Sequence, residues 1–280
     1  MTNTKQQVRE FYDEIGWQQE EDGLYQNARY DDLRPVVMDY IHNTRLRVNR
    51  GILPNGRFLL DAGSGPVQYD EYLTYSQGYQ KRVCFDISIQ ALREARKRIG
   101  NHGLFVVGDI ANLPFKQNAF DGIVSMHTIH HLPASEHKRA YNELFRVLAE
   151  GKSASIVNGW TNPTLTGWLD HLIIFSRRLR RVLRGKPTRA QPHDEKATFV
   201  QKTSARWLRR ELGDTVSVEI ISWRSASTRT LRTFIHEKFG GKAILRWLYG
   251  MEERYPRFFG EYGQYPLIVV KKPSKGKDEY

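Results

Sequence analysis

The sequence predicts a doubly wound α/β fold built on a mostly parallel sheet of seven strands. Short apolar runs recur along the chain, and amphipathic helical segments separate most of them, which is the pattern of a parallel α/β sheet. Most runs are almost continuously apolar, as expected for strands covered on both faces. The seven predicted strands are RFLLDA (57–62), RVCFD (82–86), GLFVVGD (103–109), FDGIVSM (120–126), SASIVNG (153–159), VSVEIISW (216–223) and YPLIVVKK (265–272).

Three helices are expected between the first five strands, at about 67–77, 88–99 and 134–149. Ser88 is a natural N-cap for the second helix. The third has apolar residues at helical spacing, and Gly151 is expected to end it. These helices would cover the two faces of the sheet.

The chain divides into three predicted parts. Residues 1–50 are expected to form N-terminal lid and flanking helices, and residues 51–160 the core of the sheet. Residues 161–280 are expected to complete the sheet and to cap a substrate pocket. This third part contains a basic segment, 163–191, and a basic and aromatic helical insertion, 224–264.

Composition narrows the class of protein. The chain has 280 residues, 40% of them apolar, which is enough for a substantial core. Its apolar stretches are far shorter than the ~20 residues of a membrane span, and the polar N-terminus has no signal-peptide core, so a cytoplasmic protein is expected. Cys84 is the only cysteine, so an intrachain disulfide is excluded.

Positive charge is concentrated in the second half of the chain. Residues 1–150 carry 18 Lys and Arg against 19 Asp and Glu, whereas residues 151–280 carry 25 against 12. An excess of this kind indicates contact with something acidic: a nucleic acid, a membrane surface or an anionic substrate. The charge alone does not choose among them.

Three predicted strands end in an acid: Asp61, Asp86 and Asp109. In a parallel sheet the carboxyl ends of the strands lie on one edge, where ligands bind, so the three carboxylates should converge there. A glycine turn, Gly63 and Gly65, follows the first acid. A carboxylate beside such a turn would repel a pyrophosphate, so the ligand should instead carry a cationic end together with a ribose.

Two nucleotide motifs are absent. The third glycine of G-x-G-x-x-G would fall at Gln68, and no G-x-x-x-x-G-K-[ST] occurs.

In the order and spacing of "LLDAGSGP", "CFDIS" and "VVGDIANLPF", residues 57–159 resemble the class I, Rossmann-like SAM-dependent methyltransferases, in their small-molecule branch. The resemblance implies a Rossmann-like methyltransferase fold and S-adenosyl-L-methionine (SAM) as cofactor.

The resemblance also implies roles for the residues at the strand ends. Gly63 and Gly65 would lie against the methionine moiety, with Asp61 towards its ammonium group. Asp86 would accept hydrogen bonds from both ribose hydroxyls. Asp109 would accept one from the adenine amino group.

Further positions follow from the same resemblance. Ile87 would flank the adenine, and the Ile110 N–H would bond a ring nitrogen. Tyr12 would belong to a lid over the cofactor, for which Tyr30 and Arg34 are further candidates. Val67 stands where the family often has a third glycine, which leaves the shape of the turn open.

Three histidines, His127, His130 and His131, follow the fourth predicted strand. A neutral imidazole can accept the acceptor's proton during methyl transfer, so His130 is the predicted catalytic base and His131 the second candidate. His127 would line the methionine end of the pocket. The competing interpretation is that His131 only packs under the helix that begins near Pro133 and that proximity does most of the catalysis. No metal is expected, because no cysteine accompanies the histidines and neighbouring side chains diverge.

The basic segment 163–191 has seven Lys and Arg against one acid, with apolar residues broadly on one side. It could be an interfacial helix on an anionic membrane at the inner surface, a cap on an apolar pocket, or a packed helix with a solvated face.

The predicted function is in-line methyl transfer from SAM to a small, hydrophobic or lipid-like acceptor. The alternatives are a nucleic-acid methyltransferase, which the basic charge motivates although no RNA-binding module is present, and a non-catalytic SAM-binding or membrane-peripheral regulator. The sequence leaves the acceptor, the methylated atom and the oligomeric state open.

Overall fold

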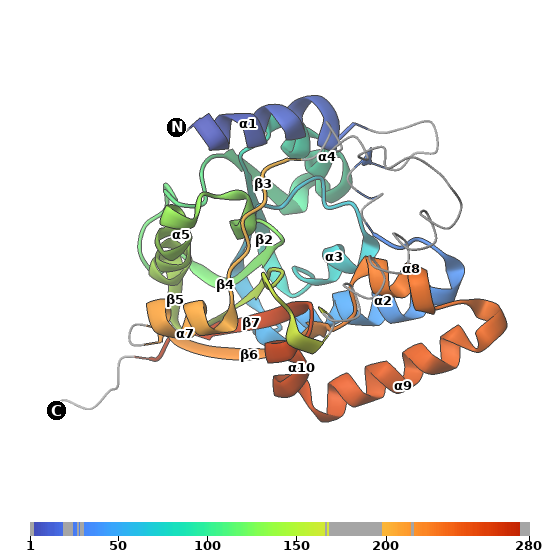
Figure 1. Ribbon diagram of the computed structural model, residues 1–280. Coiled ribbons are helices and arrows are strands. Elements are labelled where there is room, and N and C mark those ends of the chain that lie inside the picture. Colours follow the sequence, from blue (N-terminus) through green and yellow to red (C-terminus); the bar gives the residue numbers. More distant parts are fainter. Residues whose placement is uncertain are drawn as a thin grey trace.

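The computed structural model describes residues 3–18, 25–26, 28, 31–165, 167, 198–213 and 216–274. Its centre is a seven-stranded sheet in the order β3-β2-β1-β4-β5-β7-β6 (Figure 1). The strands are β1 (Gly56–Ala62), β2 (Tyr79–Asp86), β3 (Gly103–Val107), β4 (Phe120–Met126), β5 (Leu148–Val157), β6 (Ser217–Arg224) and β7 (Tyr265–Lys271).

The first five strands pair in parallel, and β7 runs antiparallel to both β5 and β6. The predicted fold class is therefore confirmed. The chain order reverses between β1 and β4, which opens a crevice at the carboxyl ends of the parallel strands. Because β6 is parallel to β5, its last residues also lie at this edge.

Alternate residues of the strands pack on opposite faces of the sheet. Leu60 belongs to the larger core, which α5 (Ala134–Val147) and α7 (Ala205–Leu212) cover. Leu59 belongs to a second core with Val48. Both leucines are fully buried, so helical segments cover both faces, as the nearly continuous apolar strands predict.

Of the remaining helices, α4 packs on β2 and β3, and α9 and α10 lie beside the β6 end of the sheet (Figure 1). On the N-terminal side, α1 is followed by a π-helical turn, Tyr12–Gly16, and α2 is flanked by 3-10 turns at Pro35–Val37 and Arg47–Gly51. Between β6 and β7 lie three helices, with α10 packed on β6 and α9 against α2. The bounds are α1 (Asn3–Phe11), α2 (Met38–Leu46), α3 (Asp70–Thr74), α4 (Ile89–Ile99), α8 (Thr228–Phe234), α9 (Gly241–Arg254) and α10 (Pro256–Tyr262).

Two helix boundaries differ from the prediction. The first helix of the core, α3, is much shorter than 67–77. The other, α5, ends at Val147 and passes directly into β5, so the prediction that Gly151 ends it was wrong. The Nζ of Lys272 donates to the carbonyls of Phe145 (3.0 Å) and Leu148 (2.8 Å) and so satisfies the helix end from another strand.

Ser88 caps α4 as predicted, because its side chain accepts a hydrogen bond from the Ala91 N–H. The basic segment 163–191 falls almost entirely on residues outside those described. In the described part of the chain, no helix is both long and apolar enough to cross a membrane.

Val67 has a φ of +55°, which is unusual for a β-branched residue. Its side chain is fully buried against Cys84, Leu92 and Ala95. The turn therefore keeps the left-handed backbone of a glycine position and fills the space with a valine. Backbone strain of about 1–2 kcal/mol opposes the gain from burying the side chain.

We predict that Val67→Gly is more stable than Val67→Ala by about 1 kcal/mol. Both variants lose the buried side chain, but only glycine relieves the left-handed strain. Urea unfolding of the two variants and the wild type measures this. An alanine variant as stable as the glycine variant would show that position 67 is not strained.

Candidate functional site

A cavity of about 450 Å³ opens at the carboxyl edge of the sheet, where the strand order reverses. Its lining comes from the glycine turn after β1, the ends of β2 and β4, the loop after β3, α1 with the following turn, and the β6 and β7 ends. We describe it as two lobes. The β2–β3 side forms the first lobe, and the β6–β7 side forms the second.

Gly63 and Gly65 line the first lobe, and both have positive φ, +76° and +55°. A Cβ on Gly63 would lie 2.1 Å from Thr128 Oγ1, and one on Gly65 would lie 3.1 Å from the Trp17 ring. The backbone of the turn therefore approaches its neighbours too closely for larger residues. The N–H groups of the turn are bonded within the protein, because Gly63 and Ser64 donate to the Phe85 carbonyl (2.7 and 3.2 Å) and Gly65 donates to Asp86.

Asp86 lies at the end of β2 and also lines the first lobe. Its Oδ2 accepts from the Gly65 N–H (2.9 Å) and its Oδ1 from the Ser88 N–H (2.9 Å). Burial raises the pKa of this carboxyl to about 6, although the backbone hydrogen bonds oppose the shift. Ile87 lines the cavity beside it.

Asp61 does not line the cavity, unlike the other two strand-end acids. Arg82, on the neighbouring strand β2, donates from Nε to Asp61 Oδ2 (3.1 Å) and pairs with the same oxygen through Nη2. Arg82 also donates to the Tyr72 carbonyl (2.5 Å). Both charged side chains are buried, so the pair fixes β1, β2 and the segment after the glycine turn to one another.

Asp109 lines the first lobe together with Ile110. It accepts from Lys5 Nζ (2.5 Å), the Asn112 amide (2.8 Å) and the Ala111 N–H (2.9 Å). Burial raises the pKa of this carboxyl, but the hydrogen bonds from Lys5 and Ala111 outweigh it, and the pKa lies below its ordinary value. Asp109 is therefore held in its charged form.

The N-terminal segment crosses over this lobe and is tied to it at three points. Lys5 of α1 bonds Asp109, and Asp13 accepts a hydrogen bond from the Ser88 hydroxyl (2.6 Å). The third point is Tyr12, whose hydroxyl lies 2.8 Å from His131 Nε2. The Tyr12 ring stacks on Trp17, with centroids 5.1 Å apart.

His131 is hydrogen-bonded at both ring nitrogens. Its Nδ1 lies 2.7 Å from the Phe199 carbonyl, which can only accept, so Nδ1 carries the proton. Nε2 then accepts from the Tyr12 hydroxyl. His130 differs, because its Nδ1 is buried and makes no hydrogen bond within 3.5 Å. Its side-chain neighbour is Asn158, which raises the pKa of the imidazole against the larger effect of burial.

All three histidines line the cavity and are neutral at pH 7. Burial, reinforced by the charge of Arg224, lowers the pKa of His127 to about 3. Burial also lowers the pKa of His131 to about 4 and that of His130 well below its ordinary value, the latter with help from its two histidine neighbours. His127 packs edge-on against Trp223 (5.2 Å between ring centroids).

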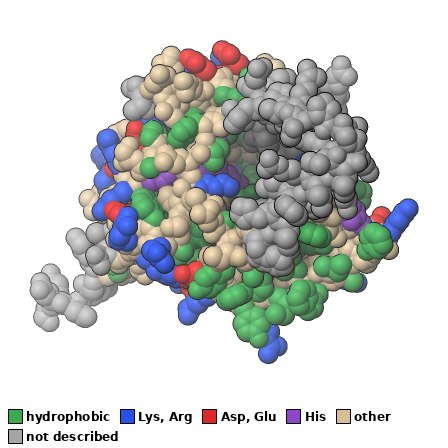
Figure 2. All heavy atoms as spheres, in the orientation of Figure 1, with side chains coloured by type: hydrophobic (Ala, Val, Ile, Leu, Met, Phe, Trp, Pro, Cys, Tyr) green, Lys and Arg blue, Asp and Glu red, His purple; other side chains and the backbone are tan. Residues whose placement is uncertain are grey.

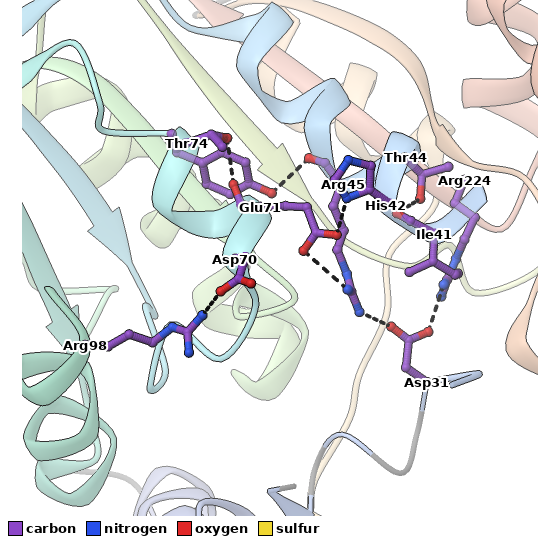
Figure 3. A network of polar contacts seen from close by, with 11 residues as sticks. Asp31, Ile41, His42, Thr44, Arg45, Asp70, Glu71, Thr74, Arg98 and Arg224 are labelled. Carbon is purple, nitrogen blue, oxygen red and sulfur yellow. Dashed lines mark hydrogen bonds and ion pairs between the residues drawn. The ribbon is translucent and has the colours of Figure 1, made fainter. Parts of the chain in front are cut away.

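The second lobe is built around Asp31 (Figure 3). Its two oxygens accept from Arg224 Nη1 and Arg45 Nη2, each at 2.9 Å. Burial raises the pKa of Asp31, but the two arginines outweigh it and lower the pKa from 3.8 to about 2. Aromatic rings surround this pair, and Arg45 lies 3.3 Å above the centroid of Tyr69. The aromatic residues that line this lobe are Tyr69, Tyr72, Trp223 and Tyr265.

The cavity thus brings together ten of the eleven predicted site residues and leaves out Asp61. Those that line it are Tyr12, Gly63, Gly65, Asp86, Ile87, Asp109, Ile110, His127, His130 and His131. Of the other lid candidates, Tyr30 lies outside the described residues, and Arg34 instead pairs with Asp32 (2.7 Å). Sequence reasoning missed Lys5, Trp17, Asp31 and Arg224, which come from segments distant in the chain.

Within the described ranges, no group of three or more His, Cys, Asp or Glu side chains is arranged to hold a metal ion.

The sequence of residues 60–156 matches the family model of a methyltransferase domain. No relative of the chain is found among curated proteins.

Two solved structures resemble the whole chain. Geranyl diphosphate C-methyltransferase from Streptomyces coelicolor A3(2) has 16% identity and a TM-score of 0.56, with 97% of this chain and 98% of that chain covered. The [4+2]-cyclase SpnF has 19% identity and a TM-score of 0.53, with 98% of each chain covered. At these identities the likeness shows the fold, which is the Rossmann-like methyltransferase fold. The cyclase indicates that this fold also serves other reactions.

We predict that Asp31→Asn lowers the free energy of unfolding by about 3–5 kcal/mol at pH 7, because Arg45 and Arg224 stay buried without their shared anion. In the double variant Asp31→Asn with Arg224→Met, the loss of unfolding free energy should be smaller than the sum of the losses in the two single variants by about 1–3 kcal/mol. Urea unfolding measures both. Additive losses would mean that the pair is not coupled.

The lowered pKa of the Asp31 carboxyl predicts that the stability of the protein depends on pH. The folded pKa of this carboxyl lies below its ordinary value, so its contribution to stability is complete above about pH 4 and is lost as the pH falls towards 2. The difference between wild type and Asp31→Asn should therefore shrink over that range. A difference that stays constant down to pH 2 would contradict the lowered pKa.

Proposed function

Because the chain contains a class I SAM-dependent methyltransferase domain, we propose that it transfers the methyl group of SAM to a small, hydrophobic or lipid-like acceptor in the second lobe. The observation that carries the proposal is the continuity of the cavity. The glycine turn and Asp86 line one lobe, four aromatic rings line the other, and the three histidines lie in the same lining. A cofactor and an acceptor bound in the two lobes would meet beside these histidines.

In this proposal SAM occupies the first lobe. The glycine turn takes the methionine moiety, and Asp86 accepts from the ribose hydroxyls. Ile87 and the Ile110 N–H contact the adenine. We do not assign Asp61 to the ammonium group of SAM, because Arg82 already holds its carboxylate in a buried pair.

Asp109 keeps room for the adenine amino group. A carboxylate has about four acceptor positions, and Lys5, Asn112 and Ala111 occupy three of them. One position therefore remains for the cofactor. Lys5 would then hold the carboxylate in place while α1 covers the bound adenosine and excludes water.

The residues beside the proposed methyl position would hold the acceptor and take its proton. We assign the proton to His130, whose buried Nδ1 makes no close hydrogen bond and whose side-chain neighbour is Asn158, and not to His131, whose nitrogens are both bonded. As the methyl group leaves, the sulfonium becomes a neutral thioether and the acceptor's proton makes the imidazole cationic. The cavity therefore holds the same net positive charge before and after the transfer. This offsets the cost of protonating a buried histidine, whose pKa is low.

Methyl transfer can be tested with SAM carrying a tritiated methyl group, incubated with the protein and a cell extract. The proposal expects label in the small-molecule fraction that partitions into organic solvent. Label in acid-precipitable nucleic acid would favour the nucleic-acid alternative. Binding of SAM without any transfer would favour a non-catalytic role or a reaction of another kind.

We predict that SAM affinity falls about tenfold for each pH unit below 6, because binding to the ionised carboxylate of Asp86 must first remove its proton. His127 and His131 titrate at about pH 3 and 4 and do not interfere between pH 5 and 7. Calorimetric titration with SAM across this range measures the effect. Asp86→Asn, as control, should bind weakly and without this pH dependence, and a flat wild-type profile would contradict the assignment.

We predict that His130→Ala lowers the rate of methyl transfer by about 10²–10⁴-fold and leaves SAM affinity within about threefold of wild type. Tyr12→Phe serves as a comparison, since it removes the hydrogen bond to His131 and leaves His130 in place. Single-turnover rates with the identified acceptor measure both. A loss of less than fivefold in His130→Ala would favour catalysis by proximity alone.

A further inference from the structure

Between β6 and β7, the chain presents large apolar side chains to solvent. The most exposed are Phe239 (76%) and Trp247 (65%). Figure 2 shows hydrophobic side chains gathered on the lower edge of the molecule, over α9 and α10. We call this surface the aromatic face; it consists of Phe239, Ile244, Trp247, Tyr255, Phe258 and Tyr262, all at least 42% exposed.

The aromatic face does not arise from poor packing of α9. The other side of this helix buries Leu245 in a core with Val36 and Tyr40 of the N-terminal segment. Ile244 and Trp247 lie one helical turn apart on the outer side. A helix that is apolar on both sides has a second surface to cover, and an exposed cluster of this kind marks an interaction site.

Positive charge borders the aromatic face. Five exposed basic residues lie on or beside α9 and α10: Lys238, Lys242, Arg246, Arg254 and Arg257. The acids of the same segment are mostly engaged elsewhere. Glu252 and Glu253 pair with Arg47, and Glu261 pairs with Arg209. Two of the five bases are themselves paired, Lys242 with Glu237 (4.0 Å) and Arg257 with Glu219 (3.3 Å), so the excess positive charge of the border comes from Lys238, Arg246 and Arg254. Aromatic rings with a basic border are typical of a surface that lies in the interface of an anionic membrane.

The segment between β6 and β7 is joined to the second lobe at both ends. It leaves the sheet after Trp223 and Arg224, and it returns at Tyr265; all three residues line the cavity. Thr228, the first residue of α8, lines it as well. A surface bound to the aromatic face would therefore lie on the element that closes the second lobe.

We propose that the aromatic face docks on the surface of an anionic phospholipid bilayer. The delivery of a membrane-dissolved acceptor to the second lobe would rest on the proposed function, whereas docking does not. A symmetric contact with a second copy is less favourable, because it would oppose two basic borders with few acids to offset them. Nucleic acid is also less favourable, because the aliphatic side chain of Ile244 offers no ring on which a base could stack.

The test is co-sedimentation of the full chain with vesicles of phosphatidylcholine alone and of phosphatidylcholine mixed with phosphatidylglycerol, at low and high salt. We expect binding to the anionic vesicles that weakens with salt. Trp247→Ala with Phe258→Ala should weaken it at least tenfold. Arg246→Gln with Arg254→Gln should weaken binding to anionic vesicles only.

The matched control is Arg93→Gln with Arg96→Gln, which removes the same charge from exposed positions on α4 and should not change binding. SAM affinity is measured for each variant and should stay at the wild-type value, which shows that the fold is intact. Because SAM binding is measured separately from vesicle binding, a failure of docking can be distinguished from a failure of the proposed function.

Three results would overturn the proposal. The first is anionic-vesicle binding that is absent or unchanged in Trp247→Ala with Phe258→Ala. The second is a wild-type dimer in sedimentation velocity that this variant converts to monomer, which would assign the aromatic face to a second copy. The third is binding of a single-stranded RNA oligonucleotide that the same variant abolishes while vesicles do not bind.

Discussion

The shared carboxylate of Asp31 determines how the cavity closes. Arg45 comes from α2 and Arg224 from the end of β6, and both are almost fully buried, so each needs a nearby anion. Arg45 extends the network to Glu71 of α3 (3.5 Å), which also pairs with His42 (Figure 3). The N-terminal segment, the helix after the glycine turn and the edge of the sheet must therefore assemble together. The second lobe lies where these charges are compensated.

Local patterns predict the sheet but not this network. The strands follow from apolar runs, and the edge where Asp86 and Asp109 lie follows from parallel pairing, so most of the first lobe could be predicted from the sequence. Asp31 and Arg224 are separated by 193 residues, and no periodicity links them. Likewise, the rule that strand-end acids face the ligand edge did not reveal the partner of Asp61. That partner depends on register: Asp61 lies opposite Cys84, so Arg82 is its diagonal neighbour on the same face.

The glycine turn is a second feature whose structure could not be predicted from the sequence. A missing third glycine at Val67 left the shape of the turn open, yet the backbone keeps the positive φ that glycine would adopt. Burial against Cys84 and Leu92 compensates for the strain, and only the packed structure reveals that compensation. A motif can thus keep its backbone conformation while losing the residue type that usually marks it.

The two lobes differ in the charged side chains that line them, and this difference affects which kind of acceptor the second lobe favours. The first lobe carries Asp86 and Asp109, which suit a cationic ligand such as the SAM proposed to bind there. The second lobe carries Arg224, which is paired with Asp31, and Lys202; both cations help to keep His127 neutral. Because Asp31 compensates Arg224, a cationic acceptor there would be repelled mainly by Lys202 and by the sulfonium, with little water to screen the repulsion. An acceptor that enters this lobe uncharged and apolar avoids that cost, and the surrounding aromatic rings supply the contact area that such a molecule needs.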